Sequence, residues 1–209
     1  AHFIPFPETK RTLKQTRASL QMLFKKHPVG AVLMEPIQGR AGIRVPPPEL
    51  LRELSVLCRK HDALFICDEI YTGLGRTGKM FAFEHSSIKP DGLILGKALG
   101  GGLLPISCFL STSEVMQWFV PGSHGSTFGG YPLAAAIGKR SLEVIEEEKL
   151  VENSNQQGNY FLAELKKIES PILKQIRGKG LWIGVEIDTK IIDGRNICKY
   201  LLKKGILCK

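Results

Sequence analysis

Two short apolar runs that each end in a charged side chain constrain this sequence most. Residues 64–67 (Leu-Phe-Ile-Cys) run into Asp68 and Glu69, and residues 93–95 (Leu-Ile-Leu) lead through a glycine into Lys97. Each run has the length and composition of a strand buried on both faces, as in a parallel sheet. If the two strands are neighbours, Asp68 and Lys97 emerge at the same carboxyl edge. That edge is where open α/β sheets bind ligands.

The surrounding segments predict an α/β fold with a mostly parallel sheet flanked by helices. An apolar strand at 29–34, a helix opened by the prolines at 46–48 and the strand at 64–67 form a βαβ unit, which implies a right-handed crossover. Apolar periodicity predicts four further helices, at 13–27, 132–148, 150–168 and 197–204. Apolar runs predict strands at 106–110 and 181–187 and a strand beginning at 206–209.

Composition excludes several classes of protein. Of the 209 residues 43% are apolar and 23% charged, which is ordinary for a soluble globular chain, and no apolar run approaches the ~20 residues of a membrane helix. The start of the sequence lacks the pattern of a signal peptide and an initiator methionine. Five scattered cysteines without a CxxC pair predict reduced core thiols in a cytosol-like compartment. The net charge of +9 comes from dispersed basic residues, which favours a solvated surface over a nucleic-acid site.

The Asp68–Lys97 pair points to a specific chemistry. A lysine amine forms a Schiff base with an aldehyde, and the apolar flanks of Lys97 predict an amine held partly out of water. A carboxylate facing a lysine-held aldehyde is what pyridoxal phosphate needs, because a protonated pyridine nitrogen makes its ring an electron sink. Two alternatives remain open: Lys97 can point into solvent, and Asp68 can cap the following helix.

Other candidate residues lie in loops. Ser126 and Thr127 lie among glycines and suit a phosphate, although a plain turn explains them equally well. Glu35 follows the strand at 29–34, where it either faces the crevice or makes a cap or salt bridge. The glycines at 73, 75 and 78 predict a mobile loop. His85 and His124 have no partner at metal-ligand spacing, so no metal site is predicted.

Four segments together resemble one family. Residues 34–39 (Met-Glu-Pro-Ile-Gln-Gly), 67–78 (Cys-Asp-Glu-Ile-Tyr-Thr-Gly-Leu-Gly-Arg-Thr-Gly), 95–102 (Leu-Gly-Lys-Ala-Leu-Gly-Gly-Gly) and 124–130 (His-Gly-Ser-Thr-Phe-Gly-Gly) are similar to class III (ω-amino acid) pyridoxal-phosphate aminotransferases. The resemblance implies a fold-type I transferase. Residues 1–148 would be part of its cofactor-binding large domain, and residues 149–209 a connecting helix and the start of a smaller α+β C-terminal domain.

The resemblance also implies roles for individual residues. Lys97 would carry the cofactor and shuttle the proton, and Asp68 would face the pyridine nitrogen. Tyr71 stands where the family often has a glutamine beside the cofactor's phenolic oxygen, and a phenol can donate there too. Ser126 and Thr127 would reach the cofactor phosphate of a neighbouring subunit, which implies a homodimer with the active site at its interface.

Two positions bear on the substrate. Glu35 matches a family position that lines the active site. Arg40 stands where members acting on ornithine carry a glutamate, so it either holds a substrate carboxylate bidentately or faces solvent.

The implied reaction moves an amino group from an ornithine-like ω-amine to a 2-oxo acid such as 2-oxoglutarate. Acetylornithine, 4-aminobutyrate and other class III transaminases, or an aminomutase, are the alternatives. We expect no nucleic-acid or membrane partner, and a cytoplasmic location or, in a eukaryote, the mitochondrial matrix. Family members are about twice as long, with a glycine-rich phosphate cup upstream and a substrate-binding arginine downstream. The chain therefore resembles a central fragment, and an inactive dimerisation fragment is the alternative of another class.

Overall fold

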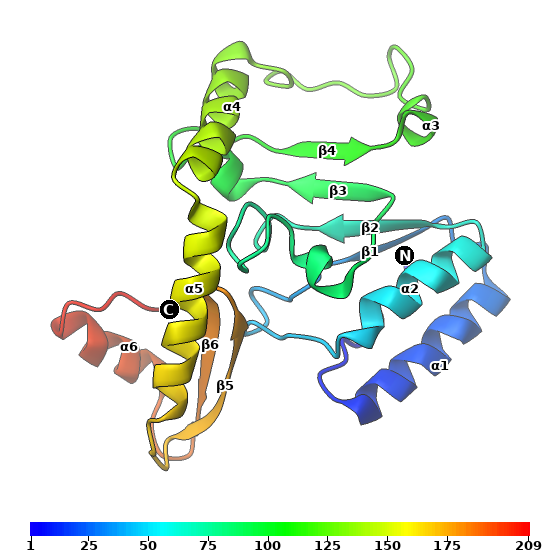
Figure 1. The fold of residues 1–209 in the computed structure, drawn as a ribbon. Helices are drawn as coiled ribbons and strands as arrows, with labels where there is room; N and C mark the ends of the chain where they lie inside the picture. Colours follow the sequence, from blue (N-terminus) through cyan, green and yellow to red (C-terminus); the bar gives the residue numbers. More distant parts are fainter.

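The computed structural model describes residues 1–209, apart from the side chain of Lys10. A four-stranded sheet in the order β1-β2-β3-β4 forms its first part (Figure 1). β1 (Ala31–Met34), β2 (Leu64–Asp68) and β3 (Gly92–Leu95) are parallel, and the edge strand β4 (Cys108–Ser111) is antiparallel to β3. The predicted βαβ unit and mostly parallel sheet are therefore confirmed.

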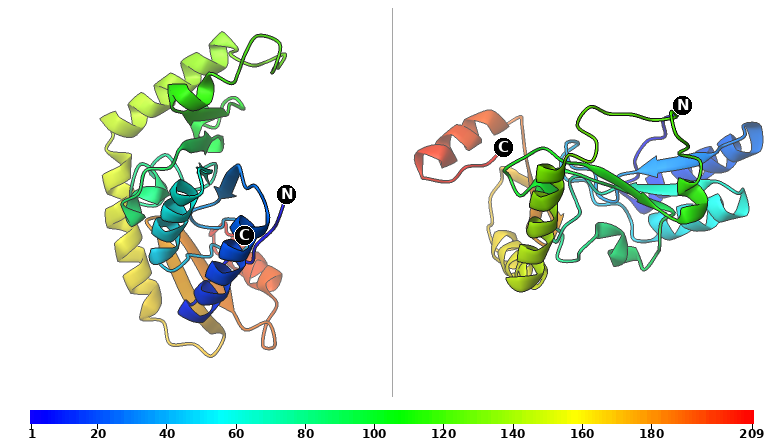
Figure 2. Two further views of the ribbon diagram at one scale, coloured as in Figure 1. Left: turned by 90° about the vertical axis from the view of Figure 1, so that its right-hand side faces the viewer. Right: turned by 90° about the horizontal axis from the view of Figure 1, so that it is seen from above.

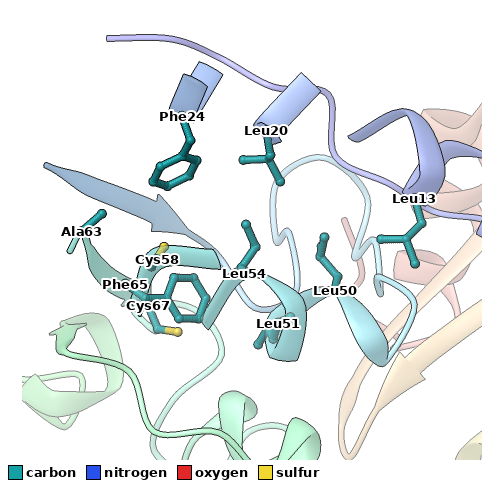
Figure 3. Close-up of a cluster of buried hydrophobic side chains, with 10 residues drawn as sticks. All are labelled: Leu13, Leu20, Phe24, Leu50, Leu51, Leu54, Cys58, Ala63, Phe65 and Cys67. Atoms are coloured by element: carbon teal, nitrogen blue, oxygen red, sulfur yellow. The ribbon is translucent and has the colours of Figure 1, made fainter. Parts of the chain in front are cut away.

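Two helices cover one face of this sheet. α1 (Lys10–Lys26) begins at a Thr9 cap, and α2 (Glu49–Lys60) follows three prolines. Figure 3 shows how their apolar faces meet the inner face of β2. The ten side chains of this cluster are Leu13, Leu20, Phe24, Leu50, Leu51, Leu54, Cys58, Ala63, Phe65 and Cys67. Since burying a leucine or phenylalanine contributes roughly 1.5–3 kcal/mol, this cluster fixes the strand that ends at Asp68.

After the sheet, the C-terminal part of the chain begins with two consecutive helices, α4 (Pro132–Glu147) and α5 (Leu150–Lys166). They follow one another along one side of the molecule (Figures 1 and 2). An antiparallel hairpin of β5 (Leu173–Lys179) and β6 (Trp182–Ile187) packs against α5, and α6 (Gly194–Lys203) follows. The remaining short helices are η1 (Ala82–Ser86), η2 (Lys97–Gly100) and α3 (Ser113–Met116).

The observed strands differ from the predicted ones in two places. β5 was not expected, because Lys174, Gln175 and Arg177 interrupt its apolar pattern. Residues 206–209, expected to begin a strand, form none. Instead α6 ends in a reversing turn, in which Gly205 has φ +82° and Ile206 N–H bonds to the Leu201 carbonyl. A strand needs a paired neighbour, and the described backbone hydrogen bonds give residues 207–209 none.

The predicted domain boundary falls between α4 and α5. Lys149, which has a φ of +51°, lies at the junction of the two helices. The division at this point remains a prediction. Among the described residues, no helix combines the length and apolar character needed to cross a bilayer.

Candidate active site

Asp68 and Lys97 leave the sheet at the same edge. Asp68 is the last residue of β2, and its register partner in the parallel strand β3 is Ile94. Lys97 follows three residues later, as the first residue of η2. The shared edge expected from the two apolar runs is therefore present.

The backbone at Lys97 is unusual. Its φ of +45° lies in the left-handed region, where a residue with a Cβ is rarely found. Leu95 and Leu99, only 4% and 6% exposed, anchor the chain on both sides. Strained residues of this kind cost about 1–3 kcal/mol and cluster at functional sites. The side chain itself is exposed, so the prediction of an amine held partly out of water was wrong.

The Lys97 amine lies over an aromatic ring. Its Nζ is 3.8 Å from the ring centroid of Tyr71, a residue of the loop that follows β2. Asp68, at the start of this loop, is half-buried, and its Oδ1 accepts the N–H of Ile70 at 3.0 Å. No helix follows Asp68 directly, so the capping alternative was wrong; this bond closes a local turn, and Oδ2 can accept a further donor.

The loop after β2 is packed and bonded, and its expected mobility remains a prediction. Glu69, 1% exposed, accepts the Thr72 hydroxyl and the Phe83 N–H, the latter at 2.9 Å. Burial raises the pKa of the Glu69 carboxyl. Further along, Thr77 bonds His85 Nε2 through its carbonyl at 3.1 Å and its hydroxyl at 3.2 Å.

The loop after β1 has its own internal bonds. The Glu35 carboxylate accepts the Gly39 N–H at 2.9 Å; this bond is local to the loop and caps no helix, because the next helix begins at Glu49. Gln38 and Arg44 exchange backbone hydrogen bonds of 3.1 and 3.0 Å and close the loop. Arg40 lies in this loop and is exposed. Its proposed role toward a substrate carboxylate remains a prediction.

The β5–β6 hairpin supports both loops, which sequence reasoning missed. Arg177 donates to the carbonyls of Gly42 and Ile43 at 2.8 and 3.2 Å, and it pairs with Glu186 at 2.6 Å. No local pattern marks such contacts, because Arg177 and Gly42 are 135 residues apart. Only the strand assignment of β5 would have placed Arg177 on an element facing this loop.

Trp182 connects the hairpin to the ring beneath Lys97. Its ring centroid is 5.7 Å from that of Tyr71, and the Arg76 guanidinium carbon lies 5.0 Å from the Trp182 ring centroid. A Cβ at Gly39 would lie 3.1 Å from Tyr71 and 3.2 Å from Trp182, so the backbone there closes tightly on both rings. The cluster of Lys97, Tyr71, Trp182 and Arg76 thus spans both halves of the chain.

Ser126 and Thr127 lie elsewhere. They belong to the exposed loop 121–130, which lies beyond the edge strand β4 between α3 and α4 (Figure 1). Within one chain the structure therefore does not bring them to the edge that carries Asp68 and Lys97. Their expected role at a neighbouring subunit remains a prediction.

Comparison with known proteins identifies the family. A family model described as aminotransferase class-III matches residues 2–209. Ornithine aminotransferases of Halalkalibacterium halodurans and Bacillus subtilis are each 54% identical over 179 residues, 86% of this chain and 44% of theirs. The chain thus spans less than half the length of these relatives.

Solved structures agree with this assignment. The ornithine aminotransferase of Toxoplasma gondii, described as holding PLP at partial occupancy in its active site, matches with a TM-score of 0.89 and 42% identity. That match covers 92% of this chain and 46% of the other. The acetylornithine aminotransferase of Elizabethkingia anophelis gives a TM-score of 0.87 at 42% identity over 92% of this chain and 49% of its own. With nearly every residue matched by the family model and the same fold in solved relatives, this chain belongs to the class-III aminotransferase family.

Proposed function

We propose that the whole protein is a pyridoxal-phosphate-dependent aminotransferase that takes an amino group from an ornithine-like ω-amine and gives it to a 2-oxo acid such as 2-oxoglutarate. One observation carries the proposal: Lys97 and Asp68 follow neighbouring parallel strands to the same carboxyl edge of the sheet. Family membership supports the same chemistry.

The residues at this edge fit the cofactor. Lys97 offers an exposed primary amine that can bond to an aldehyde carbon. Asp68 is half-buried, and the Ile70 N–H holds its carboxylate in one orientation. Its Oδ2 can then accept a hydrogen bond from a protonated ring nitrogen. Bound there, the cofactor supplies an electron sink for charge that develops at the substrate carbon.

Each residue then has a defined task. Lys97 would hold the aldehyde carbon and, once displaced by the donor, move the proton at the substrate's reacting carbon. Asp68 would keep the ring nitrogen protonated. The hydroxyls of Ser126 and Thr127, from the exposed loop 121–130, would hold the phosphate in a second subunit, which makes the proposed enzyme a homodimer.

Ornithine is our first choice of donor because curated relatives at 54% identity carry that name. An acetylornithine aminotransferase is also similar, so acetylornithine is the second choice. A panel of amine donors with the purified full-length enzyme and 2-oxoglutarate separates these two and 4-aminobutyrate. Arg40→Glu in the same panel tests whether Arg40 selects a donor: the ratio of kcat/KM values between donors should change if it does.

Variants of the full-length protein test the reaction itself. Lys97→Ala should abolish the cofactor's lysine-bound absorbance band and slow amino transfer at least about 10²- to 10⁴-fold, the usual contribution of a general base. Asp68→Asn should retain the cofactor and slow proton abstraction about 10²- to 10³-fold in single turnovers, the size typical of one lost electrostatic contact. Lys79→Ala, which removes an exposed lysine of the same loop region, is the control. A normal cofactor spectrum in Lys97→Ala, or an undiminished rate in Asp68→Asn, would refute the assigned roles.

A further inference from the structure

The Tyr71 ring meets Lys97 through its face. The 3.8 Å from Lys97 Nζ to the ring centroid is well within the ~6 Å at which an ammonium is attracted to the negative face of an aromatic ring. A donor hydroxyl, the role expected for Tyr71 from the family's glutamine, does not require this geometry. The ring face therefore needs an explanation of its own.

The ring is held in this position from two other sides. The backbone at Gly39 approaches its Cγ so closely that an added Cβ would lie 3.1 Å away. Trp182, from β6, lies at a tilt of 34° with a centroid distance of 5.7 Å. Because Trp182 is in turn covered by the Arg76 guanidinium, Tyr71 has little room to turn its face away from Lys97.

The amine, by contrast, is free to move. Lys97 is exposed, and its side chain has several rotatable bonds with which to leave and return. An attraction to a ring face tolerates small displacements, since it depends on a broad quadrupole and not on one lone pair. The contact between Tyr71 and Lys97 thus pairs a fixed ring with a mobile cation.

We propose, on the basis of the proposed aminotransferase function, that Tyr71 is a positioning residue whose ring face holds the free ammonium of Lys97 while that amine is not joined to the cofactor. The ring keeps the amine at the sheet edge that also carries Asp68, from which it can return to the cofactor. Glutamine, common at this position in the family, has no ring and cannot do this.

The expected size of the effect follows from the strength of such contacts. At an exposed site a cation–π contact favours the ring-bound position about 2- to 5-fold. Phenylalanine presents the same face without the hydroxyl, so Tyr71→Phe should retain the effect. Tyr71→Leu and Tyr71→Gln should lose it.

Nuclear magnetic resonance tests this directly. The full-length protein, depleted of cofactor, is reductively methylated with ¹³C-formaldehyde, which keeps each lysine charged, and the Lys97 methyl signal is assigned with Lys97→Arg. The ring current should move this signal upfield in the wild type and in Tyr71→Phe. In Tyr71→Leu and Tyr71→Gln it should lie with the signals of exposed lysines. Circular dichroism confirms that each compared variant is folded, and Tyr71→Gln serves if Tyr71→Leu is not.

An identical Lys97 signal in Tyr71→Phe and in a folded ring-free variant would overturn the proposal, as would a wild-type signal among those of exposed lysines. This measurement involves no amino transfer. Its failure is therefore distinct from failure of the proposed function, which the cofactor spectrum of Lys97→Ala reports.

Discussion

Replacing Gly158 with alanine tests how the second half of the chain supports the site. Gly158 lies inside α5, where a Cβ would be 2.1 Å from the carbonyl carbon of Gly180 and 2.2 Å from its oxygen. Gly180, in the β5–β6 turn, is equally close to the site loop: a Cβ added there would lie 2.4 Å from the Thr77 carbonyl carbon and 2.5 Å from the Gly78 nitrogen. Helix, turn and loop are thus in backbone contact, and no side-chain rotation can relieve an added methyl.

The magnitude has three parts. For the added methyl to reach an ordinary contact distance of 3.4 Å, α5 and the turn must move apart by about 1.3 Å. Overpacking of this kind destabilises a protein by about 1–3 kcal/mol. That shift disturbs two hydrogen bonds to the Arg76 carbonyl, from Ser154 Oγ at 3.0 Å and Leu181 N–H at 3.2 Å, each worth about 1 kcal/mol. Alanine has a better helix propensity than glycine, which stabilises the folded state by about 1 kcal/mol. We expect a net loss of about 2–4 kcal/mol.

Urea unfolding of the full-length protein, followed by circular dichroism, measures this loss as a lower midpoint. Gln157→Ala, at the neighbouring exposed position of the same helix, is the matched control and should stay within about 0.5 kcal/mol of the wild type. A Gly158→Ala protein as stable as the wild type, or more stable, would refute the close approach of α5 to Gly180. It would also remove the argument that this turn holds the Arg76 segment in place.

Two further predictions concern the same supports. Burial and the nearby Lys179 charge lower the pKa of His85, so the folded state binds fewer protons than the unfolded state. Stability should therefore be fully present above about pH 6.5 and fall as the pH drops below it, and pH-dependent thermal unfolding should show a smaller fall in His85→Gln. Arg177→Lys keeps the charge but loses the fork that binds the Gly42 and Ile43 carbonyls, so trypsin should cleave after Arg40 several-fold faster than in the wild type; equal cleavage rates would contradict the role of Arg177 as the anchor of this loop.

The parts of the fold that sequence could predict are those with local signals. The shared edge of Asp68 and Lys97 followed from two apolar runs, because parallel strands bring their carboxyl ends together. The helix at Glu49–Lys60 followed from its prolines and its apolar stripe. In both cases the information lies within a few residues of the element itself.

What could not be predicted depends on contacts between distant segments. The glycines at 73, 75 and 78 indicated a mobile loop, yet they allow Glu69, Val151 and Asn155 to approach closely. Apolar flanks indicated a partly buried Lys97, but those flanks anchor the backbone and leave the side chain exposed. A glycine permits both flexibility and close packing, and only the partner segment decides between them.

The two charged residues of the site are held in different ways, and the difference suits their proposed tasks. The Asp68 carboxylate accepts a directional hydrogen bond from the next turn of its own chain, so its position relative to the sheet is fixed. Lys97 ends on a flexible stem and rests on a ring face, where the attraction is soft and easily reversed. A group that must keep a ring nitrogen protonated throughout a reaction should not move. A side chain that must bond to the cofactor, leave it, carry a proton and return has to move. A nearby ring face can hold its ammonium between these steps. Because Trp182 and Gly39 pack against that ring, the β5–β6 hairpin would act on the Lys97 amine through Tyr71 if Lys97 has the proposed role.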